Sequence, residues 1–163
     1  MKEIERKFIV KNSSFFRREY FPYHSKTEFI IGSEIEQGYF ENGKVRIRII
    51  DGTYSFLTIK NNISNISRYE FEYEIPIDDA YQMTDLFCNK LEKTRYKCKF
   101  KSRIWEVDIF KGENEGLQLA EIELESENEE IVLPDFIGEE VTGDKRYYNS
   151  YLAKHPFSRW KKK

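Results

Sequence analysis

Histidine and cysteine are scarce in this sequence, with two of each among 163 residues. These residue types bind zinc and serve in much acid–base and nucleophilic catalysis. Cys88 and Cys98 have no other cysteine or histidine at ligand spacing, so a thiolate zinc site is not supported. His24 and His155 lie outside the charged strands described below, and neither is a persuasive general base. So few cysteines fit a reducing cytoplasm.

Long apolar runs and a large net charge are also missing. No segment approaches the roughly 20 apolar residues that cross a bilayer, and the charges before Phe8 argue against a signal peptide. The 27 basic and 29 acidic residues are interleaved, whereas nucleic-acid binding needs a net basic surface. We therefore expect a soluble cytoplasmic protein without membrane or nucleic-acid partners, in which the basic tail 161–163 is a solvated terminus.

Aromatic and charged residues are abundant instead, at 16% and 34% of the chain. Disordered chains are poor in aromatic residues, so this composition indicates a folded protein with many charges to place. The length suits one domain with a substantial core, and we see no internal repeat or interdomain linker. We therefore expect a single domain over residues 1–163.

Alternation of polar and apolar residues predicts about eight strands, with Asn42–Gly43 and Asp51–Gly52 as hairpin turns. The predicted strands cover residues 2–10, 27–40 with a break at Gly32, 44–50, 54–60, 68–75, 92–100, 104–110 and 117–125. Helices are expected at 12–20, 78–90 and 145–154. This order is typical of an α+β fold, mostly antiparallel, built as a barrel or a sandwich.

Charged residues recur at every second position of these strands, and therefore share a face. Glu3 and Glu5 form a pair of carboxylates that suits a hard divalent cation, and Lys7 beside them suits an anion such as phosphate. Later strands carry sets of one sign: Arg46 and Arg48; Lys60 beside Thr58; Glu70, Glu72 and Glu74; Lys93, Arg95, Lys97 and Lys99; Glu106 and Asp108; Glu121, Glu123 and Glu125.

Two arrangements explain these charged faces. Taken one strand at a time, a half-buried sheet with its charged face in water is the favoured interpretation. Taken together, the single-sign sets and the apolar, aromatic opposite face favour a barrel whose charges point inward beneath a packed outer layer. Such an interior is costly when dry and unpaired, and is stabilised by water, metal ions and a polyanion.

The Glu-x-Glu-x-Lys pattern at Glu3, Glu5 and Lys7 resembles the signature of the CYTH family, the triphosphate tunnel metalloenzymes. That pattern alone is weak, but an ordered set of similar segments runs along nearly the whole chain. The further segments are 37–39, 45–48, 57–60, 67–72, 92–96, 105–108, 120–123 and 140–147.

The resemblance implies an eight-stranded antiparallel β-barrel, a triphosphate tunnel with a few flanking helices, and a role for each matched residue. The implied metal ligands are Glu3, Glu5, Asp108, Glu121 and Glu123. The implied phosphate contacts are Lys7, Arg46, Arg48, Lys60, Lys93 and Arg95, with Lys145 and Arg146 near the tunnel mouth. Lys7, Glu70 and Glu72 are the implied catalytic residues, the two glutamates as groups that position metal and water.

The short chain looks most like the small bacterial inorganic triphosphatases, which implies hydrolysis of triphosphate to pyrophosphate and phosphate with Mg²⁺ or Mn²⁺. Oxygen ligands favour these ions over zinc. The alternatives are an adenylate cyclase or a thiamine or nucleoside triphosphatase on the same fold, and a non-catalytic polyphosphate-binding module. The retained carboxylates argue against the last of these. The expected partner is a small triphosphate, and a homodimer is left open.

Overall fold

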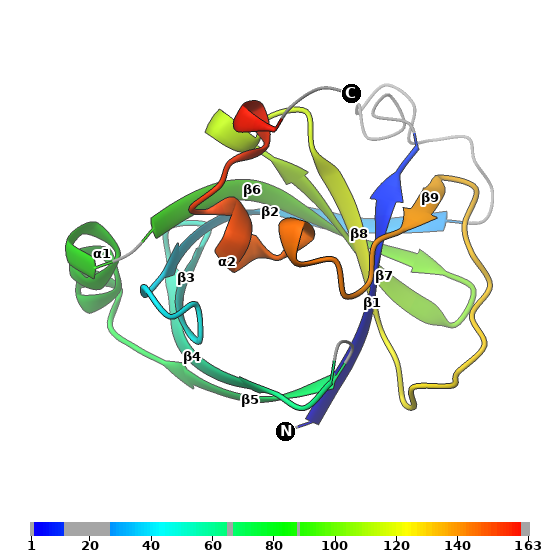
Figure 1. The fold of residues 1–163 in the computed structure, drawn as a ribbon, viewed down its shortest axis with the longest axis horizontal. Helices are drawn as coiled ribbons and strands as arrows, with labels where there is room; N and C mark the ends of the chain where they lie inside the picture. Colours follow the sequence, from blue (N-terminus) through cyan, green and yellow to red (C-terminus); the bar gives the residue numbers. More distant parts are fainter. Residues whose placement is uncertain (1, 12–26, 65–66, 88, 161–163) are drawn as a thin grey trace.

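The computed structural model describes residues 2–11, 27–64, 67–87 and 89–160, and its main feature is a β-barrel seen end-on in Figure 1. The predicted helix at 12–20, His24, Cys88 and the tail 161–163 lie outside the described residues. The strands are β1 (Lys2–Val10), β2 (Thr27–Tyr39), β3 (Val45–Ile50), β4 (Tyr54–Asn62), β5 (Ser67–Glu74), β6 (Asn89–Phe100), β7 (Arg103–Phe110), β8 (Gln118–Glu123) and β9 (Ile137–Glu140).

Eight of these strands close into an antiparallel barrel, as the resemblance implied. The order β5-β4-β3-β2-β6-β7-β8-β1 returns to its start because β1 also pairs with β5. This closing seam is short: its register joins Lys2 to Tyr69, Glu3 to Arg68 and Ile4 to Ser67. β9 lies outside the closed ring and pairs with the second half of β1, from Phe8 to Val10.

The turns that set the registers follow the sequence signals. Gly43 has a φ of +69°, and the backbone N–H of Lys44 donates to the Asn42 side chain at 2.9 Å. Asp51 and Gly52 have φ values of 51° and 64°, so both occupy the left-handed region that a tight hairpin turn requires. As a result β3 pairs with β2 and β4 so that Arg46 and Arg48 face inward while Ile47 and Ile49 face outward.

Three differences from the predicted elements have identifiable causes. β2 runs through Gly32 with a register shift between Ile30 and Ser33, so the predicted break is an irregularity within one strand. β9 was not predicted, because its four residues carry no period-two pattern long enough to recognise. The helix predicted at 145–154 is instead a 3₁₀ turn at Lys145–Tyr147 followed by the short α2 (Asn149–Leu152), which together lie over one mouth of the barrel.

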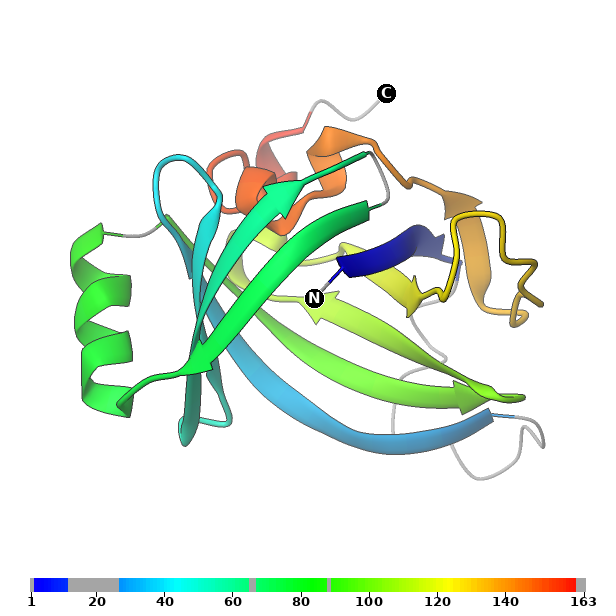
Figure 2. The same cartoon turned by 90° about the horizontal axis from the view of Figure 1, so that it is seen from below.

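Apolar side chains pack mainly on the outside of the barrel. Phe8 of β1 packs on Trp105 of β7 with ring centroids 5.6 Å apart, beneath the segment that leads to β9. The helix α1 (Ile77–Phe87) lies against the outside of the barrel beside β3 (Figure 2). It contributes Ala80 to the cluster formed with Ile47 and Ile49. Within the described residues, no helix has the length and apolar character needed to span a membrane.

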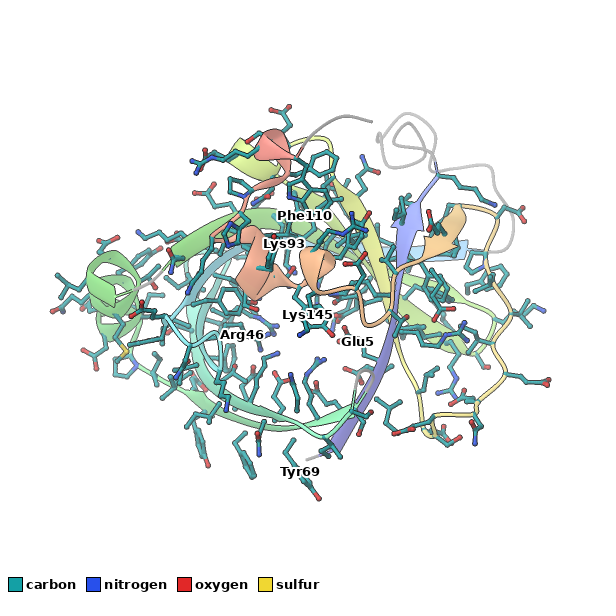
Figure 3. All side chains as sticks on the ribbon, in the orientation of Figure 1. Glu5, Arg46, Tyr69, Lys93, Phe110 and Lys145 are labelled. Carbon is teal, nitrogen blue, oxygen red and sulfur yellow. The ribbon has the colours of Figure 1, made fainter. Side chains whose placement is uncertain are left out.

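The packed outer layer that the apolar faces predicted includes Leu57 of β4, which packs on the cluster under α1, but leaves much of β4 and β5 exposed. Ile59, Tyr69, Phe71 and Tyr73 are all exposed on the outer face of these strands, and Figure 3 shows Tyr69 pointing away from the barrel. The sequence therefore predicted correctly that these four side chains face outward, but they are exposed rather than packed.

Candidate active site

A polar cavity of about 1380 Å³ occupies the inside of the barrel. Its walls carry the inward-facing charged residues of β1, β3, β4, β5, β6, β7 and β8, with residues around α2 at one end. In Figure 3 Glu5 and Arg46 point into this space from β1 and β3, on opposite sides of the barrel. The period-two alternation of each strand therefore produces one charged interior.

The wall formed by β3 and β4 is rich in cationic side chains that have too few anionic partners. Burial and the charges of Arg46 and Arg95 lower the pKa of Arg48 to about 10. Burial and the charges of Arg46 and Arg68 lower the pKa of Lys60 to about 7. The Nε atoms of both Arg46 and Arg48 are buried without a hydrogen-bond partner. A bound anion would relieve both the repulsion and the unsatisfied donors.

Glu70 and Glu72 of β5 face this cationic wall. Arg46 Nη2 lies 2.9 Å from Glu70 Oε1 and 3.0 Å from Glu72 Oε2. Burial works against ionisation of Glu70, but a hydrogen bond with Glu3 and the charges of Lys60 and Arg46 hold its pKa below the usual range. The Glu72 side chain is 38% exposed, so it combines an anchored carboxylate oxygen with access to the cavity.

The opposite wall, formed by β1, β7 and β8, is rich in carboxylates. Strand pairing places Glu5 beside Glu123, and Glu121 between Lys7 and Glu106. Burial, followed by the charges of Glu106 and Glu5, raises the pKa of Glu123. Burial and the neighbouring Glu70 raise the pKa of Glu3 to about 7. The raised pKa values show that the cationic side chains near Glu3 and Glu123 do not outweigh burial and the neighbouring carboxylates.

Lys7 lies between these acids. Its Nζ is 2.8 Å from Glu121 Oε1 and 3.9 Å from Glu5 Oε1, and also donates to the Tyr147 carbonyl at 3.3 Å. Burial opposes its charge, but Glu121 and Glu5 outweigh burial and raise the lysine's pKa. Lys7 therefore remains charged at the boundary between the acidic wall and the tunnel.

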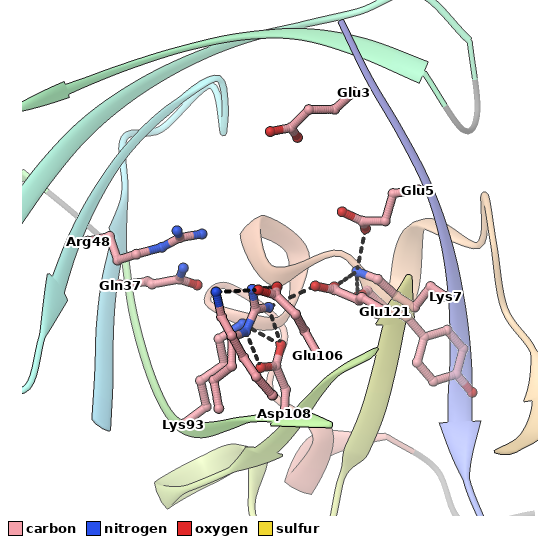
Figure 4. Close-up of polar contacts among 12 residues, drawn as sticks. Glu3, Glu5, Lys7, Gln37, Arg48, Lys93, Glu106, Asp108 and Glu121 are labelled. Carbon is pink, nitrogen blue, oxygen red and sulfur yellow. Dashed lines mark hydrogen bonds and ion pairs between the residues drawn. The ribbon is translucent and has the colours of Figure 1, made fainter. Parts of the chain in front are cut away.

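Asp108 lies in a network behind the cavity surface (Figure 4). Lys93 Nζ is 2.5 Å from its Oδ2 and Arg95 Nε is 2.6 Å from its Oδ1, and the Lys93 and Asp108 side chains are fully buried. Burial and the charge of Arg95 lower the pKa of Lys93 to about 8. Burial opposes ionisation of Asp108, but the charges of Arg95 and Lys93 lower its pKa overall. Arg95 continues to Glu121 at 2.7 Å, which links this network to the acidic wall.

The structure brings most of the predicted site residues to one cavity and leaves four outside its lining. Glu3, Glu5, Lys7, Arg46, Arg48, Lys60, Glu70, Glu72, Arg95, Glu121 and Glu123 line it. Lys93 and Asp108 lie behind it, and their predicted phosphate and metal roles stay predictions. Lys145 and Arg146 are exposed outside it, and Arg146 forms an ion pair with Asp144 at 2.6 Å.

Three lining or neighbouring residues were not assigned a role from the sequence. Arg68 and Glu106 line the cavity, and both share a strand face with predicted residues, so the period-two pattern could have identified them. Gln37 is fully buried beside Arg48 in the β2–β3 pairing, and its Nε2 has no partner. Gln37 belongs to the segment 37–39 that resembles the CYTH family, but no role was assigned to its amide.

The donor set on the acidic wall fits a hard divalent cation. It offers carboxylate oxygens from Glu3, Glu5, Glu121 and Glu123 on adjacent strands, and burial together with neighbouring carboxylates raises the pKa of Glu3 and Glu123. Among the described residues no three carboxylates converge as a ready metal site, because Lys7, Arg68 and Arg95 occupy several of their oxygens. These residues would hold a metal after their cationic partners shift.

Comparison with known proteins gives a consistent result. The CYTH domain family matches residues 1–150. An inorganic triphosphatase of Acetivibrio thermocellus is 45% identical over 165 residues, covering 98% of each chain, and one of Nitrosomonas europaea is 35% identical, covering 94% of this chain and 97% of the relative. A crystal structure of an inorganic triphosphatase has a TM-score of 0.63 at 32% identity, covering 93% of each chain.

Proposed function

Because the chain belongs to the CYTH domain family, we propose that it is a single-domain, divalent-metal-dependent triphosphatase that hydrolyses inorganic triphosphate to pyrophosphate and phosphate. The observation that carries this proposal is the division of the cavity into two walls. Burial and the charge of Arg46 lower the pKa of Arg48 and Lys60 on β3 and β4, while burial and neighbouring carboxylates raise the pKa of Glu3 on β1 and Glu123 on β8. A polyanion bound together with a divalent cation neutralises both walls at once.

The cationic wall would bind the phosphoryl groups. Arg46, Arg48 and Lys60 project from neighbouring strands, and guanidinium groups bind phosphate oxygens in pairs. Lys7 and Arg95 reach the cavity from the other side. Phosphoryl transfer depends mainly on alignment and on charge neutralisation, and a tunnel with cations on both sides supplies both to a linear anion.

The acidic wall would hold the metal through Glu3, Glu5, Glu121 and Glu123. Oxygen donors of this kind favour Mg²⁺ or Mn²⁺. Such an ion, when bound, neutralises charge on the phosphate oxygens. The structure gives Asp108 a different immediate task, since its oxygens hold Lys93 and Arg95 in place.

Glu70 and Glu72 would orient the attacking water. Arg46 and Thr58 both donate to Glu72 Oε2, at 3.0 and 2.8 Å, which fixes that carboxylate while its side chain stays accessible from the cavity. The lowered pKa of Glu70 keeps it ionised and able to accept a hydrogen bond. Lys7, charged because Glu121 and Glu5 raise its pKa, would stabilise negative charge that develops on the phosphate.

Inorganic triphosphate is the proposed substrate, because the charged residues of the cavity lining account for phosphate and metal contacts. An organic substituent also removes one terminal charge, which a tunnel with cations on both sides would otherwise bind. A phosphate-release panel with triphosphate, ATP and thiamine triphosphate, each with Mg²⁺ or Mn²⁺, tests this choice. We expect the highest kcat/KM with triphosphate, and cyclic AMP formed from ATP would favour a cyclase instead.

Metal dependence has its own test. Excess EDTA should abolish phosphate release, and Mg²⁺ or Mn²⁺ should restore it. Full turnover by chelated enzyme would contradict the proposed role of the acidic wall. A cytoplasmic location fits the sparse cysteines. The homodimer stays a prediction, and the exposed strip of Ile59, Tyr69, Phe71 and Tyr73 is the surface to test by sedimentation.

A further inference from the structure

Arg68 is the cation most closely engaged with the carboxylates at the start of β1. Its Nη2 lies 2.8 Å from Glu3 Oε2 and 2.8 Å from Glu5 Oε2. Its Nε lies 3.0 Å from Glu70 Oε2 on its own strand. By comparison, Lys7 Nζ is 3.9 Å from Glu5. One guanidinium therefore contacts two proposed metal ligands and one proposed water-orienting residue.

The position of Arg68 adds a structural consequence. Arg68 is paired with Glu3 in the β1–β5 register, in the short seam that closes the barrel. Its bonds to Glu3 and Glu5 cross that seam, whereas its bond to Glu70 stays within β5. Nε of the guanidinium thus contacts a residue of its own strand, whereas Nη2 links β5 to β1.

A divalent cation on Glu3 and Glu5 cannot coexist with this arrangement. Oxygen ligands of Mg²⁺ lie about 2.1 Å from the ion, so a metal on the oxygens that Nη2 now contacts would lie within a few ångströms of the guanidinium. Like charges at such a distance repel strongly in a partly buried site. A guanidinium stays protonated in proteins, so Arg68 cannot relieve this repulsion by losing its proton.

We propose that Arg68 is a positioning residue that holds Glu3 and Glu5 in the metal-free tunnel and must release them when the divalent cation binds. Arg68 thereby lowers the affinity of the empty enzyme for metal while it keeps the barrel seam closed. On release, the planar guanidinium would reorient as a unit toward the cavity, where a phosphate oxygen can replace the carboxylates. Bound metal therefore raises the affinity for triphosphate, and bound triphosphate raises the affinity for metal. This inference rests on the proposed function, because it concerns the same metal ligands.

The test is Mn²⁺ binding without substrate, measured by calorimetry and by electron paramagnetic resonance of free Mn²⁺, on the wild type and Arg68→Gln. We expect the variant to bind Mn²⁺ about tenfold more tightly, the factor that corresponds to one lost charge-assisted hydrogen bond. Its metal-free melting temperature should fall, because a seam contact is lost, and its Mn²⁺-induced rise should be larger than in the wild type. Unchanged or weaker Mn²⁺ binding would overturn the proposal.

Two matched variants control for charge. Arg6→Gln removes the same charge from β1, but Arg6 pairs with Glu140 on the outer face, so Mn²⁺ affinity should not change. Lys60→Met removes a tunnel cation that contacts Glu70, 3.1 Å away, and should have a smaller effect than Arg68→Gln. An equal gain in all three variants would show a general charge effect and contradict the specific role of Arg68.

Arg68→Lys covers the case in which Arg68→Gln does not fold. A lysine has one ammonium and cannot make the three contacts of the guanidinium, so we expect an intermediate gain in Mn²⁺ affinity. Failure of this inference is separable from failure of the proposed function. A wild-type enzyme that neither binds Mn²⁺ nor releases phosphate refutes the function, whereas an active wild type with unchanged variants refutes the role of Arg68 alone.

Discussion

Replacing Asp108 with asparagine should destabilise the metal-free protein strongly, although Asp108 was first identified as a candidate metal ligand. Asp108 is fully buried, and its two oxygens hold Lys93 at 2.5 Å and Arg95 at 2.6 Å. Removing one partner of a buried ion pair typically costs about 3–5 kcal/mol, because the remaining charge is left buried and uncompensated. The cause is therefore the fate of Lys93 and Arg95 rather than the loss of a metal.

The expected loss in the free energy of unfolding of Asp108→Asn lies at the lower end of this range. Burial and Arg95 already lower the pKa of Lys93 to about 8 even with Asp108 ionised, so Lys93 can lose its proton near neutral pH when Asp108 is neutral. Deprotonation limits the penalty to the lower end of the range, about 3 kcal/mol. For a chain of this length, that loss corresponds to a fall in Tm of about 6–12 °C.

The assay is thermal unfolding of EDTA-treated protein, with and without added Mn²⁺. Glu123→Gln is the matched control, because burial and the charges of Glu106 and Glu5 raise the pKa of Glu123, so its neutralisation should leave the metal-free Tm unchanged or higher. The reasoning is refuted if Asp108→Asn keeps the wild-type metal-free Tm and loses only the Mn²⁺-induced increase. That outcome would make Asp108 a metal ligand, as the family resemblance implies.

Three further predictions concern the tunnel and its outer packing. Burial and Glu70 raise the folded-state pKa of Glu3 to about 7, so the stability that protonated Glu3 contributes at low pH is lost as pH rises from about 4.5 to 7. Glu3→Gln also removes the contact with Arg68, so the prediction concerns the pH dependence alone. The metal-free Tm of Glu3→Gln minus that of the wild type should increase from pH 5 to pH 8, and a constant difference would contradict the prediction. Glu5→Gln should lose turnover, and a high Mn²⁺ concentration should partly restore it. Arg46→Ala should lose about 1.5–3 kcal/mol of transition-state stabilisation, which extra metal does not restore. Equal rescue of both variants in phosphate-release assays would contradict the metal-binding role of Glu5 and the phosphate-binding role of Arg46. Ile122 lies in the outer cluster with 2% of its surface exposed. Ile122→Ala should lower the free energy of unfolding in urea by about 2–5 kcal/mol, and an unchanged value would mean that this face is not packed.

The empty tunnel is less repulsive than its charge content suggests. Glu121, for example, is paired with both Lys7 at 2.8 Å and Arg95 at 2.7 Å. Neutralising Glu121 should therefore destabilise the fold, unlike neutralising Glu123. The two residues share a strand face and differ by two positions, and only their cross-strand neighbours distinguish them.

Local sequence determined which residues face the tunnel. Side chains alternate along a strand with a period of two, so the pattern of β1, β3 and β5 sufficed to place Glu3, Arg46 and Glu70 each on the charged face of its own strand. The turn at Asn42–Gly43 was equally predictable, because its backbone requires the left-handed conformation that glycine adopts without strain. Closure into eight strands followed from the family resemblance and is confirmed by the β1–β5 pairing.

Tertiary structure alone decided which charges meet and which stay accessible. The sequence placed Asp108 among the inward residues, but only the β6–β7 register sets it opposite Arg95 and buries it. Arg68 contacts Glu3 only because the seam brings β5 beside β1, since the two residues are 65 positions apart in the chain. Likewise, the exposure of Phe71 depends on what covers β5 from outside. Such partnerships depend on strand order and register, which arise from the closed barrel as a whole, whereas alternation along one strand follows from backbone geometry alone.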